Sequence, residues 1–198
     1  IHEVFTGFKF IGEKIKEFLE TGEYSFIFGF EESIGFLAGT YARDKDAVVA
    51  SMLVCEMAAS FKKEGKSVLT ALEDLYKTYG YYLANVQSIE LTGADAMEKA
   101  AAMMAALREK EPETIGGVAV TEVRDYRSGL ARNTKTGETE TIHLPKSNVL
   151  EFLLGDRGSV IARPSGTEPK VKFYYTAVGA TAAEAEQLLA AMKAQLAQ

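Results

Sequence analysis

The stretch VLEFLLGDRGSVIARPSGTEPKVKFYYTAV, residues 149–178, alternates short apolar runs with turn-forming residues. Two of the runs, residues 149–154 and 158–163, are joined by Gly-Asp-Arg-Gly, which is typical of a β-hairpin. A third run, residues 171–178, is rich in aromatic and branched side chains and follows a bend at residues 164–170. The stretch therefore predicts strands of an antiparallel sheet, linked by short connections.

The sequence around this stretch adds two helices and more strands. Residues 93–110 are rich in Ala and Met and predict a helix, and residues 118–126 predict a strand. The polar residues 127–141 are typical of a long loop or an exposed hairpin. A final helix begins after Thr181, which is followed three residues later by the acidic residue of a capping box. This pattern predicts an antiparallel-sheet α+β domain over residues 88–198.

The first part of the chain alternates helices and a strand. Residues 11–20 carry apolar side chains at helical spacing, and the aromatic run at residues 24–30 predicts a buried strand. A long apolar helix within residues 44–65 and another helix at residues 67–80 follow. We therefore expect a partial α/β domain over residues 1–87, and an α/β and α+β chain as a whole.

Composition limits the kind of protein. The 198 residues carry 22 basic and 28 acidic side chains, giving 22 − 28 = −6, which argues against a nucleic-acid surface and makes any anion site local. The single cysteine, Cys55, excludes an internal disulfide and is expected on a buried helix face. Because no internal disulfide is possible, we expect a reducing, cytoplasmic compartment. The sequence has no apolar run that would span a bilayer and no basic-then-apolar leader. A start at Ile1, without an initiator methionine, is typical of a fragment, a processed chain or a trimmed terminus.

Small donors cluster at the bend before the last strand. Arg163 can hold two phosphate oxygens through its planar guanidinium, Ser165 offers a hydroxyl, and Gly166 lets backbone N–H groups approach an anion. Thr167 adds a hydroxyl and Lys170 a second positive charge. This donor loop is a candidate phosphate site. Pro-Ser-Gly-Thr is also good turn chemistry, and residue type alone leaves both interpretations open.

A second candidate site lies at the polar end of the predicted strand, where Glu31 and Ser33 stand between glycines. A carboxylate can accept hydrogen bonds from two vicinal sugar hydroxyls and a serine can share one, whereas loop or helix-cap chemistry is the alternative. Lys45 precedes a helix N-terminus, where anions are favoured, or belongs to a solvated charge run. His2 and His143 are isolated and indicate neither catalysis nor metal binding.

Four motifs occur in an order that indicates a family. TGFKFIG, GFEESIGF, RDKDAV and RPSGTEPK together resemble the C-terminal half of the α-D-phosphohexomutases, the phosphoglucomutase and phosphomannomutase family, and look closest to phosphoglucomutase. The resemblance implies that residues 1–87 belong to the third, sugar-binding domain and residues 88–198 to the fourth, phosphate-binding domain. It also implies an isomerase of carbohydrate metabolism that interconverts sugar 1-phosphate and 6-phosphate through a bisphosphorylated intermediate.

The site residues that we expect fall into two sets. The sugar is expected to contact residues of the first part, namely Thr6, Gly7, Lys9, Glu31, Ser33 and Lys45. The phosphate that is not transferred is expected to contact Arg163, Ser165, Gly166 and Thr167, to which Lys170 adds its charge.

Two loops of the family are absent from the sequence. These are the phosphorylated serine loop, of the T-A-S-H-N-P type, and the magnesium loop, of the D-G-D-x-D-R type. The resemblance therefore implies a phosphoprotein whose Mg²⁺ ligands lie in missing N-terminal domains of the same polypeptide, and this chain alone is expected to be inactive. Phe36 stands where some members carry a histidine, so no acid/base role is transferred to it.

Other functions stay open at this stage. One alternative is a stand-alone phosphosugar-binding or regulatory module without catalysis, and another is phosphomannomutase or phosphopentomutase specificity. The expected partner is a phosphosugar substrate, with no nucleic acid and no membrane.

Overall fold

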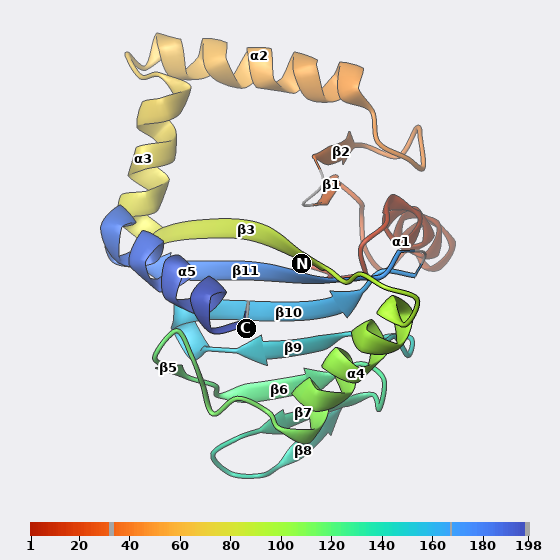
Figure 1. Cartoon of the computed structure of the whole chain (residues 1–198). Coiled ribbons are helices and arrows are strands. Elements are labelled where there is room, and N and C mark those ends of the chain that lie inside the picture. Colours follow the sequence, from red (N-terminus) through yellow and green to blue (C-terminus); the bar gives the residue numbers. More distant parts are fainter. Residues whose placement is uncertain (32–33, 167, 197–198) are drawn as a thin grey trace. The chain divides into compact units, whose positions relative to one another are not determined.

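The structure is a computed structural model that describes residues 1–31, 34–166 and 168–196. The chain divides into two compact units, Ile1–Asp74 and Leu75–Gln198 (Figure 1). Helix α3 (Val68–Tyr79) crosses this division, and the hydroxyl of Ser67 accepts from the Thr70 N–H at its start. Each unit has its own buried apolar cluster, so each is described by itself.

Helix α1 (Phe8–Thr21) confirms the helix predicted at residues 11–20. It ends at Gly22, whose left-handed φ of 68° lets its N–H donate to the Phe18 carbonyl at 2.9 Å. Its buried side chains meet the second strand of this unit, and the resulting cluster consists of Phe8, Ile11, Ile15 and Leu37. This cluster is the core of the first unit.

Strands β1 (Phe28–Glu31) and β2 (Gly35–Ala38) pair antiparallel, with Glu31 opposite Gly35. The strand predicted at residues 24–30 therefore begins four residues later, and the prediction that it is buried is wrong, since none of the residues of β1 is buried. After Ala38 the partner strand ends at Gly39, whose φ is 80°, and the last bond toward the N-terminus runs from the Gly39 N–H to the Ile27 carbonyl at 3.0 Å. The hairpin places the polar end of β1 at its turn.

Helix α2 (Ala47–Lys63) begins at Asp46, whose carboxylate accepts from the N–H groups of Val48 and Val49. None of its described side chains is buried, and Cys55 is exposed. The prediction that Cys55 lies on a buried helix face is therefore wrong. An apolar helix becomes buried only where a second layer covers it, and the apolar cluster of this unit does not include α2.

The second unit is built on a seven-stranded sheet in which every pair is antiparallel. The order is β3-β11-β10-β9-β6-β7-β8. The strands are β3 (Tyr81–Glu90), β6 (Glu122–Asp125), β7 (Leu130–Asn133), β8 (Thr139–Thr141), β9 (Leu150–Leu153), β10 (Gly158–Pro164) and β11 (Lys170–Gly179). A separate small ladder pairs β4 (Thr114–Ile115) with β5 (Val118–Ala119).

Three of these features bear on the sequence predictions. Residues 118–126 form two short strands, β5 and β6, because Val120 N–H turns away to donate to the Glu113 carbonyl. Residues 127–141 form the β7–β8 part of the sheet, as the exposed-hairpin interpretation expected. The domain boundary predicted between residues 87 and 88 lies inside β3.

Helices α4 (Ala96–Glu109) and α5 (Ala182–Leu196) supply side chains to one apolar cluster with the sheet. Met104 of α4 and Met192 of α5 join sheet residues such as Phe152 and Tyr175, all almost fully buried. The hydroxyl half of the predicted capping box of α5 is present, since Glu184 N–H donates to Thr181 Oγ1. The Glu184 carboxylate accepts from Ala180 N–H, one residue before the N-cap. Helices packed with an antiparallel sheet confirm the predicted α/β and α+β class.

The central hairpins confirm the strands predicted from residues 149–178. A 3₁₀ turn, η1 (Gly155–Arg157), joins β9 to β10. At Gly158 the φ is 118°, and a Cβ there would lie 1.9 Å from the Thr176 carbonyl oxygen, so only glycine fits. Strand β11 then returns beside β10 and carries the donor loop at the far end of this hairpin.

Candidate functional site

In the first unit, the side chains of Glu31 and Lys45 both approach the Cα of Gly35. A Cβ built on Gly35 would lie 2.5 Å from Lys45 Cδ and 2.9 Å from Glu31 Oε1. Both side chains therefore reach the same position on β2. The structure brings together a carboxylate and an ammonium from the two motifs that the sequence singled out. Ser33 of the same set lies outside the described residues.

The ammonium of Lys45 is stabilised by neighbouring acids. Its Nζ donates to Asp44 Oδ1 at 2.9 Å, and this hydrogen bond raises the pKa of Lys45; partial desolvation opposes the rise, while the charges of Asp44 and Glu31 add to it. Lys45 is thus charged at neutral pH and is suited to bind an anion or a hydroxyl oxygen.

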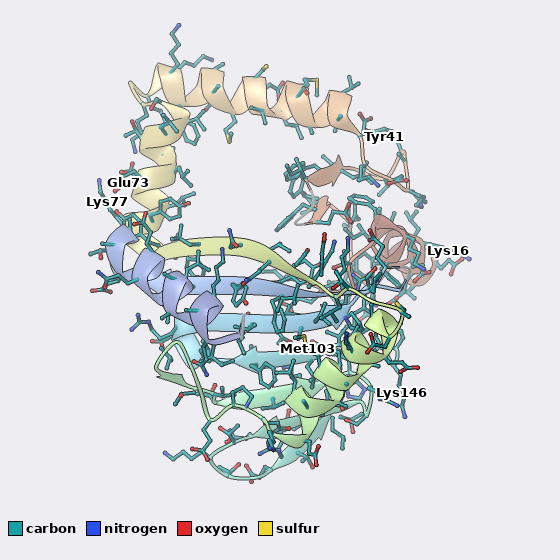
Figure 2. All side chains as sticks on the ribbon, in the orientation of Figure 1. Lys16, Tyr41, Glu73, Lys77, Met103 and Lys146 are labelled. Carbon is teal, nitrogen blue, oxygen red and sulfur yellow. The ribbon has the colours of Figure 1, made fainter. Side chains whose placement is uncertain are left out.

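The segment that carries Lys45 is anchored at both sides. Asp46 N–H donates to the Phe36 carbonyl of β2 at 2.8 Å, and the Tyr41 hydroxyl donates to the Asp46 carboxylate. Tyr41, labelled in Figure 2, lies in this segment between β2 and α2. A Cβ on Gly12 would lie 2.8 Å from the Arg43 carbonyl oxygen, so α1 packs closely against the segment backbone. The backbone on either side of Lys45 is therefore fixed.

The motif at the start of α1 reaches Lys45 through Phe8. The Lys45 Nζ lies 5.6 Å from the centroid of the Phe8 ring, a cation–π distance. Lys9 is exposed, with its Nζ 4.7 Å from the centroid of Phe10. Gly7 precedes the helix with a φ of 127°, which glycine adopts without strain, and Thr6 is next to it. The structure thus places Phe8, rather than Lys9, against Lys45.

In the second unit, the donor loop closes on itself. Ser165 N–H donates to the Lys170 carbonyl at 2.8 Å, and the Ser165 hydroxyl accepts from Glu168 N–H at 3.2 Å. A Cβ on Gly166 would have nothing within 4 Å, so open space lies on the side of Gly166 where a side chain would project. Arg163 is exposed at the end of β10. Thr167 lies outside the described residues.

Lys170 has a carboxylate beside it, as Lys45 does. Its Nζ lies 2.6 Å from Glu168 Oε2, and this hydrogen bond raises the pKa of Lys170 and lowers the pKa of Glu168. Only about a fifth of the Lys170 side chain is exposed. The charge of Lys170 is thus maintained, although Glu168 competes with any anion for it.

The structure adds a cation that sequence reasoning missed. Lys172 is the cross-strand partner of Arg163, so the two side chains project from the same face of the sheet. Lys170 is two residues away on β11 and shares that face. The feature that could have revealed Lys172 is the alternation of β11, in which residues 171, 173 and 175 are buried while 170 and 172 are not. The pairing with Arg163 required the register.

The described ranges, 1–31, 34–166 and 168–196, contain neither a metal-binding cluster nor a membrane-spanning helix. No group of three or more His, Cys, Asp or Glu side chains there could hold a metal ion. No helix in those ranges is long and apolar enough to cross a bilayer.

Comparisons with known proteins agree with these motifs. A family model described as phosphoglucomutase/phosphomannomutase, alpha/beta/alpha domain III, matches residues 1–79. A second, described as the phosphoglucomutase/phosphomannomutase C-terminal domain, matches residues 84–195. Together they span both compact units.

Curated relatives named phosphoglucomutase match most of this chain. One from Staphylococcus aureus (strain bovine RF122 / ET3-1) is 40% identical over 172 residues, which cover 87% of this chain and 31% of the relative. Another from Staphylococcus haemolyticus (strain JCSC1435) is 39% identical over 175 residues, covering 88% of this chain and 31% of the relative. The chain thus spans about a third of the length of these relatives.

A solved structure shares the fold. The open form of the phosphoprotein pp63/parafusin, a phosphoglucomutase from Paramecium, matches with a TM-score of 0.61 and 17% identity, over 96% of this chain and 31% of that one. The order of the motifs, the two family models and this fold agree. The chain belongs to the phosphoglucomutase/phosphomannomutase family and corresponds to its third and C-terminal domains.

Proposed function

We propose that this chain is the substrate-orienting C-terminal part of a phosphoglucomutase. The whole enzyme would interconvert a sugar 1-phosphate and a sugar 6-phosphate through a bisphosphorylated intermediate. The observation that carries the proposal is the placement of Arg163, Lys170 and Lys172 on one face of the sheet next to Gly166, in a chain with a net charge of −6. Two carboxylates, Glu90 opposite Lys170 on β3 and Glu168, lie beside Lys170, so Arg163 and Lys172 are the cations most available to an anion. The relatives named phosphoglucomutase support the choice of enzyme.

The donor loop would hold the phosphate that is not being transferred. Arg163 can make two parallel hydrogen bonds to phosphate oxygens, and Lys172 opposite it adds charge. Ser165, Gly166 and Thr167 would add hydroxyl and backbone donors. A fixed phosphate site of this kind accepts either end of a sugar bisphosphate and leaves the other end in place for in-line transfer.

The first unit would hold the sugar. Glu31 can accept from two neighbouring hydroxyls, with Ser33 sharing one, while the Lys45 ammonium donates to a ligand oxygen. Thr6, Gly7 and Lys9 would line the same sugar from the start of α1, next to Phe8. Orientation by such contacts lowers the entropic part of the barrier to phosphoryl transfer.

The chemical step would use parts outside this sequence. The phosphoserine loop and the Mg²⁺ ligands would lie in other domains of the same polypeptide, because neither loop of the family occurs in these 198 residues. We also propose a cytoplasmic location and a boundary between the two functional domains near residues 87 and 88. The residues of this chain would bind and orient the substrate, while Mg²⁺ would stabilise the charge of the transferred phosphoryl group.

Isothermal titration calorimetry with glucose 1-phosphate and glucose 6-phosphate tests the binding role. Arg163→Ala is expected to lose on the order of 2 kcal/mol of binding free energy for both ligands, if the contact is a charge-assisted hydrogen bond. The matched control is Arg127→Ala, an exposed arginine of the same unit that is expected to bind as the unaltered chain does. Equal affinity in Arg163→Ala and Arg127→Ala would remove the phosphate assignment.

Enzyme assays test the division of labour. The chain alone is expected to show no mutase turnover with Mg²⁺, whereas the natural polypeptide that contains it is expected to be active. Turnover by the chain alone would contradict the proposal. Binding without turnover in the natural polypeptide would favour the regulatory module instead.

A further inference from the structure

Gly35, the first residue of β2, is a glycine in the first candidate site with no backbone reason to be one. Gly35 lies outside the left-handed region of φ, so its conformation is open to any residue. What excludes a side chain is space. A Cβ at Gly35 would meet Lys45 Cδ at 2.5 Å, Lys45 Cγ at 2.9 Å and Glu31 Oε1 at 2.9 Å. All three atoms belong to candidate substrate-binding side chains.

Two nearby glycines show that this environment is distinctive. A Cβ on Gly29, in the same hairpin, would meet Ile11 Cγ2 at 2.8 Å and the Phe26 ring at 3.1 Å, so its space serves apolar packing. A Cβ on Gly12 would meet the Arg43 carbonyl oxygen, so its space serves a backbone contact. The space at Gly35 is occupied by the charged side chains of Glu31 and Lys45, whose ends are flexible and can be displaced.

Strand pairing explains why Glu31 is close. Glu31 is the register partner of Gly35 in the antiparallel ladder. Directly opposed residues project from the same face of a sheet, with Cβ atoms roughly 5 Å apart. The glycine leaves its half of that pair empty, and the stem of Lys45 fills it.

We propose that Gly35 is a positioning residue for phosphosugar binding, because its missing side chain is the space in which Glu31 and Lys45 lie together. The inference rests on the proposed function of these two side chains. An alanine at this position has to displace Lys45 first, since Lys45 Cδ is the nearest atom. The backbone beside Lys45 is anchored through Asp46 N–H to the Phe36 carbonyl, so the side chain moves rather than the segment.

A double-mutant cycle tests this by calorimetry with glucose 1-phosphate. Gly35→Ala is expected to weaken binding about tenfold, through loss of one charge-assisted contact. Lys45→Ala removes both clashing methylenes and leaves only the overlap with the flexible end of Glu31, so Gly35→Ala is expected to cost less than about twofold in that background. Gly29→Ala is the matched control, expected to lower the melting temperature and leave affinity unchanged. Additive losses, or an unchanged affinity in Gly35→Ala, would overturn the inference.

A ligand-free measurement separates this inference from the proposed function. The side-chain NMR resonances of Lys45 are expected to shift in Gly35→Ala and to keep their positions in Gly29→Ala. Unchanged Lys45 resonances in Gly35→Ala would overturn the positioning role even if the chain binds glucose 1-phosphate. If the unaltered chain binds no sugar phosphate, the proposed function fails, while these resonances still decide whether Gly35 sets the place of Lys45.

Discussion

Helix α5 packs against a seven-stranded sheet, whereas helix α2, also apolar, leaves its side chains exposed. Met192 of α5 has no exposed surface, but Met52 of α2 is 52% exposed. The second unit contains both layers of its core, one of helices and one of strands. The core of the first unit is formed by α1 and β2 without α2. An apolar sequence pattern therefore indicates that a helix can be buried. Whether it is buried depends on a second layer of helices or strands that packs against it.

The two candidate sites differ in the same way. Arg163, Lys170 and Lys172 are placed by strand register, which fixes the face from which each side chain projects. Lys45 lies in a connecting segment and is placed by the space over Gly35. A sheet can therefore fix cations by pairing alone, whereas a loop needs a specific gap to hold one.

The largest expected effect contrasts the two methionines. Met192→Ala should lower the free energy of unfolding by roughly 2 to 5 kcal/mol, because it leaves a cavity in a closed core. Met52→Ala should change it by less than about 0.5 kcal/mol, because an exposed side chain loses little packing. Urea denaturation followed by circular dichroism measures both. Equal losses in the two variants would break the comparison, since they would mean that α2 is covered.

A pair of glycines gives the next largest effect. Gly158→Ala combines a positive φ with a backbone overlap at Thr176 and should cost about 3 kcal/mol or more. Gly65→Ala has a φ of 74° but open space around it. Its cost should therefore be only about 1 kcal/mol, from the left-handed conformation alone. The same denaturation experiment sharpens the contrast, and a smaller loss for Gly158→Ala than for Gly65→Ala would contradict it.

The smallest effect concerns pH at the start of α2. The Tyr41 hydroxyl, and then the Val49 and Val48 amides, hold the pKa of Asp46 below its ordinary value of 3.8. Because the folded-state pKa is depressed, this stabilisation is complete above the ordinary pKa and is lost as pH falls through the folded-state pKa. In Tyr41→Phe the NMR titration midpoint of the Asp46 carboxyl should rise toward 3.8. A midpoint that stays in place would mean that the hydroxyl does not stabilise the carboxylate.

The sequence predicted those helices and strands that are determined by residues close together in the chain. The helix of residues 11–20 with its stop at Gly22, and the capping box at Thr181, follow from spacing and cap chemistry over a few residues. The hairpins of residues 149–178 follow from their turn residues. Cys55 was misplaced because its apolar neighbourhood says nothing of whether a covering layer is present.

The candidate sites were predictable as residue types and not as arrangements. The donor loop was visible from its residues, but Lys172 was missed because only the register pairs it with Arg163. The approach of Glu31 to Lys45 spans fourteen positions of sequence and depends on a space at Gly35 that no pattern encodes. Long-range register and side-chain space are properties of the folded chain.

The most direct test of the central claim is an NMR titration of the isotope-labelled chain with glucose 1-phosphate and with glucose 6-phosphate. Both isomers should shift the backbone amides of Arg163, Gly166 and Lys172, because in the proposed function one fixed phosphate site serves either orientation of the sugar. The amide of Arg127, in the turn after β6, should stay in place. If neither isomer shifts the donor-loop amides, the account of this chain as the phosphate-holding part of a phosphoglucomutase is wrong.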